Sequence, residues 1–189
     1  SGGMMGGMMS GMMGGDDEAF EVMRITAPSQ AGKTPIYIPN QLITLPDWRK
    51  VKPANTRKMQ LEMAMGPGMM MGRMMGRSAF SISGESMDMA VINFSVKANT
   101  FEVWELSNNS MLAHPFHIHN TQFQVLGRSG RPLAATERGL KDTVLVNPGE
   151  IVRVLIPFAG YTDTQTPYMY HCHILEHEDG GMMGQFTVT

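Results

Sequence analysis

The sequence predicts an all-β protein, an antiparallel β-sandwich or barrel that follows an extended N-terminal arm. From residue 80 onward, short apolar runs alternate with turn signals, such as those at 127–130 and 147–149. Almost no helical periodicity interrupts these runs, and many short strands of this kind are typical of a sandwich or barrel. Prolines recur between Pro28 and Pro53, so this stretch is expected to form an arm or interdomain linker without a long regular element.

The chain begins with a low-complexity segment, residues 1–15, which reads SGGMMGGMMSGMMGG. Glycine has no side chain to pack and gives the backbone wide conformational freedom, so we expect a flexible segment. Its paired methionines fit two interpretations. They are either thioether ligands for the soft ion Cu(I) or the adaptable apolar side chains of a linker.

The next elements follow from alternation of apolar and polar residues. It predicts a strand at 19–26, a short strand at 41–45 and a half-buried strand at 57–65. The second Met/Gly segment, 65–77, is expected to form a loop, with a short methionine-rich helix as the alternative. A helical turn is expected at 173–177. The later expected strands occupy residues 81–83, 91–96, 100–107, 122–126, 143–146, 151–156, 168–171 and 185–189.

Composition narrows the class of protein. The formal net charge is −2 with both signs interspersed, which gives no argument for binding to nucleic acid or to a membrane surface. No apolar run approaches the ~20 residues of a membrane-spanning helix. A single cysteine allows no internal disulfide bond. The unusual feature is the content of 21 methionines, many of them clustered beside glycines.

Every histidine and the only cysteine fall in two short motifs, HPFHIH and HCHILEH. A lone buried histidine is usually a hydrogen-bonded core residue, but six histidines at these spacings, with none elsewhere, indicate metal binding. The residues concerned are His114, His117, His119, His171, Cys172, His173 and His177.

Strand geometry divides these residues into two groups. Side chains at i and i+2 share a face of a strand, so His171 and His173 point one way and Cys172 the other. One site is therefore expected to be lined by four imidazoles, a set that suits copper, zinc or iron. These are His117, His119, His171 and His173.

The second expected site lies across the strand, at Cys172. Its candidate partners are His114, His177 and Met182, with Gly180 and Gly181 allowing a tight return of the chain. Two histidines, a thiolate and a weak axial methionine form the ligand set of a blue-copper site. Zinc usually prefers a tetrahedral set without a thioether.

The motifs HPFHIH and HCHILEHEDGGMM resemble the C-terminal cupredoxin domain of bacterial multicopper oxidases, which include laccases and copper-efflux cuprous oxidases. The resemblance extends over roughly 57–189 and includes the stretches NTQFQVLG and LKDTVLVNPGE. It implies a cupredoxin-like Greek-key sandwich at 54–189 with a Met-rich loop at 65–77. It also implies that 16–53 is the last strand of a preceding domain plus an interdomain arm.

The resemblance also implies site roles and a reaction. Type 1 copper would be held by His114, Cys172, His177 and Met182, the type 2 copper by His117, and the type 3 coppers by His119, His171 and His173. Electrons from a phenol or Cu(I) would pass from Cys172 to its histidine neighbours, and the trinuclear cluster would reduce O2 to water. Glu178 matches a carboxylate that relays protons to the cluster, the alternative being a surface acid beside Asp179.

The family's cluster uses eight histidines, whereas this chain has six in total, two of them assigned to the type 1 site. We therefore expect a fragment that needs N-terminal cupredoxin domains, in the same protein or on a partner chain. A periplasmic or secreted location is implied by the family alone. Some cuprous oxidases carry an aspartate where this chain has Ser110. Two alternatives stay open: a blue-copper electron-transfer module, or a Met-rich copper-binding protein without O2 reduction.

Overall fold

The computed structural model describes residues 23–26, 37, 39–40, 43–76, 78–159 and 161–189. The chain divides into two units, 1–42 and 43–189, and all regular secondary structure of the described residues lies in the second. The first Met/Gly segment lies outside the described residues. Residues 23–26, the described part of the strand expected at 19–26, form no strand, and neither do residues 43–45.

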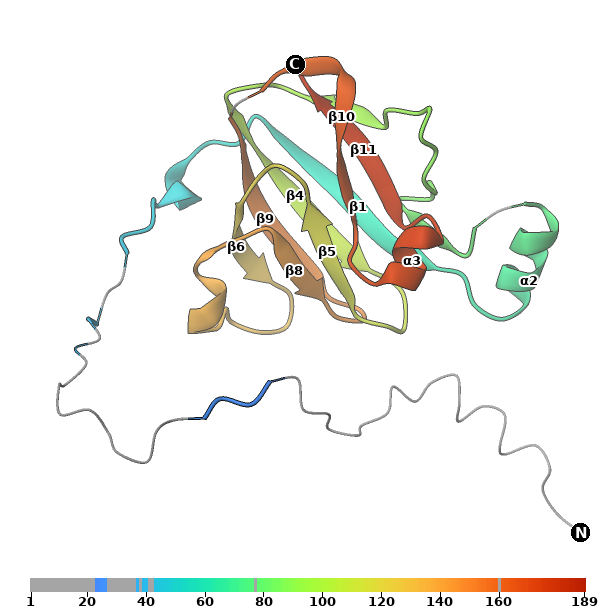
Figure 1. Ribbon diagram of the computed structural model, residues 1–189, viewed down its shortest axis with the longest axis horizontal. Coiled ribbons are helices and arrows are strands. Elements are labelled where there is room, and N and C mark those ends of the chain that lie inside the picture. Colours follow the sequence, from blue (N-terminus) through green and yellow to red (C-terminus); the bar gives the residue numbers. More distant parts are fainter. Residues whose placement is uncertain (1–22, 27–36, 38, 41–42, 77, 160) are drawn as a thin grey trace, which may run out of the picture. The chain divides into compact units, whose positions relative to one another are not determined.

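Two β-sheets make up the second unit (Figure 1). The first has six strands in the order β2-β1-β4-β9-β6-β7, and the second has five in the order β3-β11-β10-β5-β8. The strands of the first sheet are β1 (Asn55–Met63), β2 (Phe80–Ile82), β4 (Thr100–Asn108), β6 (Phe123–Arg128), β7 (Leu140–Lys141) and β9 (Ile151–Phe158). Those of the second are β3 (Phe94–Val96), β5 (His114–Ile118), β8 (Thr143–Val146), β10 (Asp163–Cys172) and β11 (Met183–Val188).

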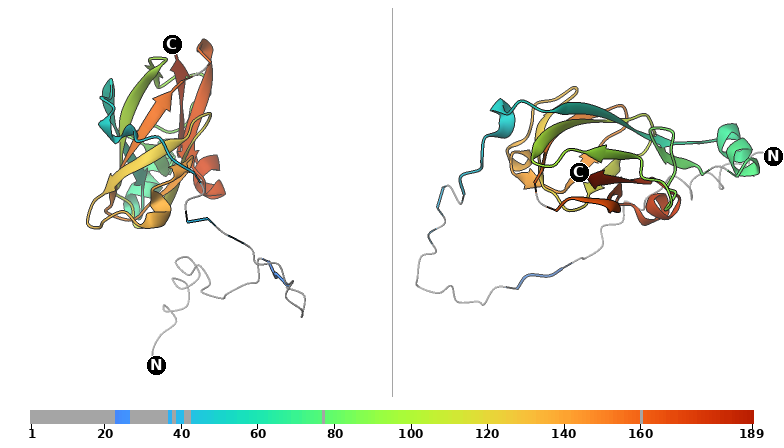
Figure 2. Two further views of the ribbon diagram at one scale, coloured as in Figure 1. Left: turned by 90° about the vertical axis from the view of Figure 1, so that its left-hand side faces the viewer. Right: turned by 90° about the horizontal axis from the view of Figure 1, so that it is seen from above.

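Short helices complete the unit. They are the 3-10 turns η1 (Trp48–Lys50) and η2 (Ala135–Glu137) and the α-helices α2 (Pro67–Met74) and α3 (Leu175–Asp179). Figure 2 shows α2 projecting from the sheets and α3 beside the C-terminal strands. No helix among the described residues is long and apolar enough to cross a membrane.

The sequence predicts an antiparallel sandwich or barrel, and two of the strand pairs in the sandwich are parallel. β1 pairs with β4 in parallel, and β3 pairs with β11 in parallel. Parallel neighbours require a long crossover connection. The segment between β1 and β4, which holds α2, β2 and β3, supplies one. The fold is therefore a sandwich of two mixed sheets.

Most other elements lie where the sequence predicts them. The strand expected at 143–146 is β8 with the same bounds, whereas β10 is longer than expected and residues 91–93 are not part of β3. The segment 65–77, expected as a loop, contains α2, which was the alternative. The helical turn expected at 173–177 is α3, two residues later.

The core lies between the two sheets, and its burial pattern positions the histidine motifs. Alternate residues of β5 are buried, so His114 and Phe116 face the core while His117 faces away. β5 pairs antiparallel with β10, with His117 opposite His171 and Phe116 opposite Cys172. The two histidine motifs are therefore neighbours in one sheet.

Candidate metal centre

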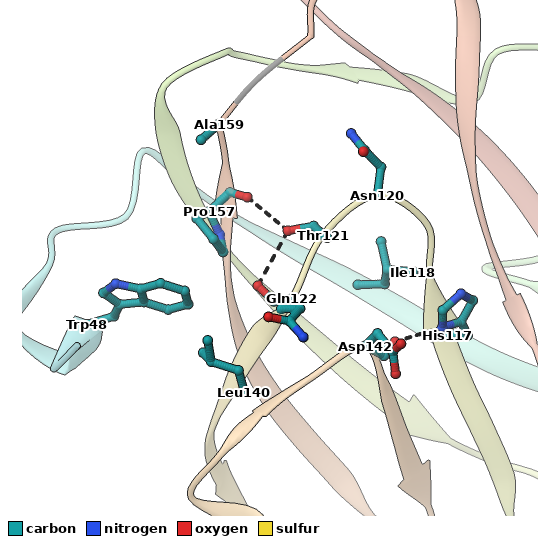
Figure 3. A pocket seen from close by; sticks show the side chains of 10 residues that line it. All are labelled: Trp48, His117, Ile118, Asn120, Thr121, Gln122, Leu140, Asp142, Pro157 and Ala159. Atoms are coloured by element: carbon teal, nitrogen blue, oxygen red, sulfur yellow. Dashed lines mark hydrogen bonds between the residues drawn. The ribbon is translucent and has the colours of Figure 1, made fainter. Parts of the chain in front are cut away.

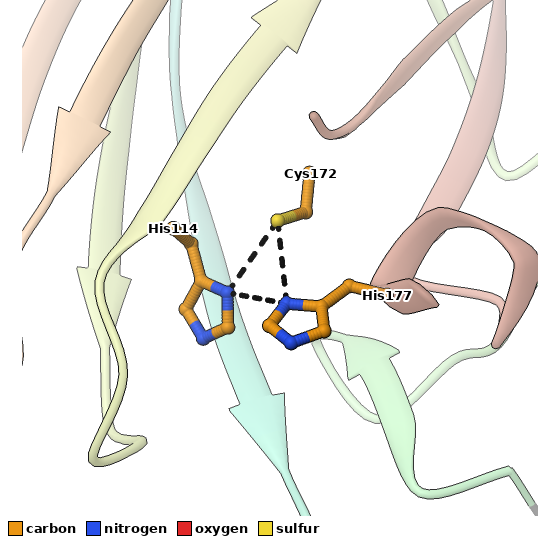
Figure 4. Close-up of side chains that lie close together, drawn as sticks. All are labelled: His114, Cys172 and His177. Carbon is orange, nitrogen blue, oxygen red and sulfur yellow. Dashed lines mark hydrogen bonds between the residues drawn. The ribbon is translucent and has the colours of Figure 1, made fainter. Parts of the chain in front are cut away.

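Three side chains from three elements converge in the core, at one end of the sandwich (Figure 4). His114 begins β5, Cys172 ends β10 and His177 lies in α3. The Cys172 Sγ atom lies 3.5 Å from Nδ1 of His114 and 3.5 Å from Nδ1 of His177. The two Nδ1 atoms are 3.1 Å apart. We call this group the buried cluster.

Burial shapes the protonation of the buried cluster. Desolvation, followed by repulsion from His177, lowers the pKa of His114 to about 4. Desolvation likewise lowers the pKa of His177 and raises the pKa of the Cys172 thiol to about 11. Without a cation the imidazoles are therefore neutral and the thiol is protonated, whereas a bound cation favours the thiolate.

The donor set fits copper. Two neutral imidazole nitrogens and one sulfur converge within the reach of a single ion. Two histidines and one cysteine in a trigonal arrangement are characteristic of blue-copper sites, which add a weak axial methionine. Met182 is completely buried, directly precedes β11, and its carbonyl accepts a hydrogen bond from the Cys172 N–H at 3.0 Å.

A hydrogen-bonded chain fixes the orientation of His114. The amide nitrogen of Asn108 donates to the carbonyls of Leu112 and Val146, so Asn108 Oδ1 faces Ser110. The Ser110 hydroxyl donates its single proton to Asn108 Oδ1 at 2.8 Å or to the Leu112 carbonyl at 3.0 Å. The hydroxyl therefore accepts a hydrogen bond from Nε2 of His114, 2.6 Å away. That tautomer leaves the Nδ1 lone pair facing Cys172.

A second group of imidazoles lies on the other face of β5 and β10, and we call it the outer cluster. Nε2 of His119 and Nε2 of His171 are 3.1 Å apart, and His117 completes a group within reach of one ion. The ring of His173 lies 5.5 Å from that of His117 and 5.4 Å from that of His171, and its side chain is exposed.

Hydrogen bonds leave the Nε2 atoms of two of these rings free to face an ion. Nδ1 of His117 lies 2.9 Å from the carbonyl oxygen of Asp142, an acceptor only, so this nitrogen carries the proton. Nδ1 of His171 lies 3.1 Å from the Cys172 carbonyl and 3.3 Å from the Glu178 carboxylate. Desolvation lowers the pKa values of His117 and His119, with further lowering by His171, so both imidazoles are neutral at pH 7.

A pocket opens beside the outer cluster (Figure 3). It has a volume of about 480 Å³. His117 and Asp142 lie at one side of the pocket and Trp48 at the other. The remaining lining residues are Ile118, Asn120, Thr121, Gln122, Leu140, Pro157 and Ala159. Polar groups and exposed imidazoles therefore share this face of the molecule.

Sequence reasoning missed several residues of the two clusters. Ser110 was noted only as a departure from an aspartate, yet it lies against His114. Phe80, from the segment after α2, stacks on the His177 ring. Thr143 and Asp142 hold His117. Only Ser110, four residues before His114, had a signal in the sequence.

A β-sandwich whose interior holds a converging His-Cys-His group, with a second histidine group on the opposite face of the same strands, defines a cupredoxin domain with copper as its cofactor. The chain belongs to the multicopper oxidase family, whose sequence profile matches residues 52–189.

Known proteins similar to this chain include members of that family from several organisms. A multicopper oxidase of Staphylococcus aureus is 45% identical over 113 residues, which cover 58% of this chain and 24% of that protein. A laccase of Haloferax volcanii is 49% identical over 90 residues, 46% of this chain and 15% of that protein.

Solved structures that resemble this chain are also those of multicopper oxidases. The multicopper oxidase of Campylobacter jejuni superposes with a TM-score of 0.67 at 34% identity, covering 82% of this chain and 34% of that one. The enzyme of Pediococcus acidilactici gives a TM-score of 0.68 at 32% identity, covering 84% and 31%. The chain thus spans about a quarter of the length of the first curated relatives and about a third of these structures.

Proposed function

We propose that this chain is the C-terminal, electron-accepting domain of a multicopper oxidase. The observation that carries the proposal is the convergence of His114, Cys172 and His177 within 3.5 Å in the core. In this proposal the buried cluster, with Met182 as axial ligand, holds the type 1 copper. The outer cluster holds part of the trinuclear site, with His117 as type 2 ligand and His119, His171 and His173 as type 3 ligands.

Bound copper would supply one-electron redox chemistry at the buried cluster and the reduction of O2 to water at the completed outer cluster. The chain's own contribution is the connection between the two. Cys172 belongs to the buried cluster, and its neighbours in sequence, His171 and His173, point to the outer face. Single peptide links thus join the two groups, and Cys172, His171 and His173 are the residues proposed to carry electrons.

Glu178 supports this site from α3. Its carboxylate oxygen lies 3.3 Å from Nδ1 of His171 and is 28% exposed, so it connects the ring to solvent. By holding the Nδ1 proton, Glu178 and the Cys172 carbonyl keep Nε2 of His171 facing His119. We propose that Glu178 also exchanges protons between solvent and the outer cluster.

The outer cluster requires partners. It offers at most four imidazoles, and the sequence holds no further histidine outside the buried cluster. We infer that N-terminal cupredoxin domains, in the same polypeptide or on a separate chain, supply the remaining ligands. O2 and a reducing substrate would be the small-molecule partners, and the location would be periplasmic or secreted, as the family resemblance implies.

Colour is the direct test of the buried cluster. We expect the chain loaded with Cu(II) to show an intense visible absorption from thiolate-to-copper charge transfer, because thiolate is the one sulfur anion available. Cys172→Ser should abolish the band while circular dichroism keeps the β-sheet signal. Glu178→Gln, on the outer face, should leave the band unchanged and serves as the matched control. A colourless copper-loaded wild-type chain would contradict the proposal.

Two reducing substrates are candidates, a phenol and Cu(I). Exposed methionines favour Cu(I): in and after α2, Met70, Met71, Met74 and Met75 are between 67% and 86% exposed. Thioethers suit soft Cu(I), and the similar protein of Campylobacter jejuni is described as a metallo-oxidase. Replacing these four residues with leucine in the complete oxidase should lower Cu(I) oxidation more than phenol oxidation. Equal losses would assign the methionines to packing alone.

One observation favours a narrower function for the chain by itself. The buried cluster has all four of its proposed ligands in this chain, whereas the outer cluster does not. Alone, the chain would act as a blue-copper electron-transfer module. Oxygen uptake in the presence and absence of a partner separates that activity from oxidase activity.

A further inference from the structure

The ring of Phe80 lies flat on the imidazole of His177. The two ring centroids are 4.6 Å apart, and the planes meet at 28°. Phe80 is half-buried, whereas His177 is only 6% exposed. One face of the His177 imidazole is therefore covered by an aromatic ring rather than by solvent.

Several contacts hold Phe80 in this position. Its N–H donates to Ser78 Oγ at 3.0 Å, and its carbonyl accepts from Ser86 Oγ at 2.6 Å. Ser78 Oγ also donates to the carbonyl of Gly180, so the segment after α2 is tied to the loop that follows His177. A Cβ atom at Gly180 would lie 2.3 Å from the Phe80 ring, so only glycine at that position lets the ring approach.

The other imidazole of the buried cluster offers no alternative approach. His114 has no exposed surface, and Ser110, itself fixed by Asn108, accepts the hydrogen bond from its outward nitrogen. His177 is thus the imidazole of this cluster that an external molecule can approach. The position where a flat molecule would stack on His177 is the position that Phe80 occupies.

We propose that Phe80 is a specificity-determining residue that keeps planar aromatic reductants from stacking on His177. This inference rests on the proposed function, in which the buried cluster accepts electrons. A planar reductant meets the Phe80 ring instead of the imidazole and loses the direct aromatic contact. A reductant that cannot stack has no such contact to lose, so the chain disfavours aromatic donors relative to compact ones.

The first test uses the metal-free full chain and needs no activity. Diethyl pyrocarbonate acylates accessible neutral imidazoles, and peptide mass spectrometry reports each histidine separately. In Phe80→Ala the acylation rate at His177 should rise severalfold, because removal of the ring uncovers an imidazole that is only 6% exposed in the wild type. Phe80→Tyr, which keeps the ring, should match the wild type.

Phe101→Ala is the matched control, because it removes a partly exposed ring that contacts Trp48 instead of His177. It should leave His177 as unreactive as in the wild type. Acylation of His114 should stay low in every variant if Phe80 covers His177 alone. An unchanged His177 rate in Phe80→Ala would overturn the proposal.

The second test uses the copper-loaded chain in stopped flow, with loss of the charge-transfer band as the readout. Each reductant molecule gives up one electron, hydroquinone also releasing a proton to the buffer, and Cu(II) becomes Cu(I). The ratio of the hydroquinone rate constant to the hexacyanoferrate(II) rate constant should rise about fivefold in Phe80→Ala. Phe80→Tyr should restore the wild-type ratio.

The outcomes separate the two proposals. A coloured wild-type chain whose rate ratio is the same with and without Phe80 overturns the role of Phe80 and leaves the proposed function intact. A colourless wild-type chain overturns the proposed function, and the specificity role with it. A similar change of ratio in Phe101→Ala would also overturn the proposal, since it would assign the effect to general loosening of the fold.

Discussion

At the scale of single residues, hydrogen bonds decide which imidazole nitrogens can act as ligands. Ser110 accepts from Nε2 of His114, and the carbonyl of Asp142 accepts from Nδ1 of His117. These contacts turn Nδ1 of His114 toward the core and Nε2 of His117 toward the outer face. Histidine thus presents a different ring nitrogen in each of the two clusters, and the neighbouring acceptors determine which nitrogen it is.

Ser110→Ala should weaken copper binding at the buried cluster. It removes the acceptor that fixes the tautomer of His114 and leaves Nε2 buried without a partner, a loss that costs about 1–3 kcal/mol of stability. Loss of such a supporting contact lowers metal affinity by about 10–100-fold. Copper titration against a competing chelator, with thermal unfolding alongside, measures both effects. Ser107→Ala, in β4 and bonded to the Met59 carbonyl, is the control and should bind copper normally.

Met182→Leu should retain the visible colour and shift the reduction potential. The colour arises from the thiolate of Cys172, whereas a weak axial ligand chiefly tunes the potential. Leucine preserves the volume of this completely buried side chain, so the fold should persist. Redox titration of the charge-transfer band gives the potential. Loss of copper binding would assign Met182 a larger part than that of an axial ligand.

At the scale of elements, the local pattern predicted some features, and others depended on distant parts of the chain. The alternation of side chains along a strand predicted that Cys172 and His171 point to opposite faces of the sheet. In the structure Cys172 lies beside His114 in the core, and His171 lies beside His119 on the outer face. The stacking of Phe80 could not be predicted, because it joins residues almost a hundred positions apart. The parallel pairing of β1 with β4 is equally non-local, and glycines in 65–77 concealed the period of α2.

Charged residues hold the loop between β6 and β8. Glu137, in η2, accepts hydrogen bonds from both nitrogens of the Arg131 fork, from Arg128 and from the Ala134 N–H. Arg128 also binds Glu150 at 2.9 Å, and its side chain is only 4% exposed. The Arg131 hydrogen bonds, with those from Ala134 and Arg128, lower the pKa of Glu137 from 4.5 to about 2.

Glu137→Gln should therefore destabilise the chain in a pH-dependent way. Because the folded-state pKa is depressed, the stabilisation is fully present above pH 4.5 and is lost as pH falls toward 2. The Arg131 side chain is 42% exposed, so solvent screens its interaction with Glu137. We therefore expect the variant to lose about 1–2 kcal/mol of unfolding free energy at pH 7. Urea unfolding at pH 7 and pH 3 should show a smaller difference at pH 3. A loss of stability that does not depend on pH would contradict this account.

At the scale of the whole molecule, the domain contains two candidate metal-binding clusters, one in the core and one on the outer face. Strands β5 and β10 supply both, with core-facing residues forming the buried cluster and outward-facing residues the outer cluster. Within the buried cluster, the core encloses His114 and Cys172, which are completely buried, whereas His177 is 6% exposed. The outer cluster lies beside the pocket that Trp48 and Asp142 border, on a face that holds exposed imidazoles. One face of the β5–β10 pair therefore carries the buried cluster, and the other face carries the outer cluster, for which we propose that a partner supplies further ligands.

That division predicts how oxygen chemistry depends on the partner. The 189-residue chain alone, loaded with copper, should be reduced by hydroquinone but should consume no O2 beyond the buffer control, because its outer cluster lacks half of the ligands that the family uses. Adding N-terminal cupredoxin domains that carry two HxH motifs should restore oxygen uptake, measured with an oxygen electrode. His119→Ala, on the outer face, should abolish the restored uptake and leave the colour of the buried cluster, since the two sites use different residues. Substantial O2 uptake by the single chain would show that the outer cluster needs no partner, and the proposed division between the two faces would then be wrong.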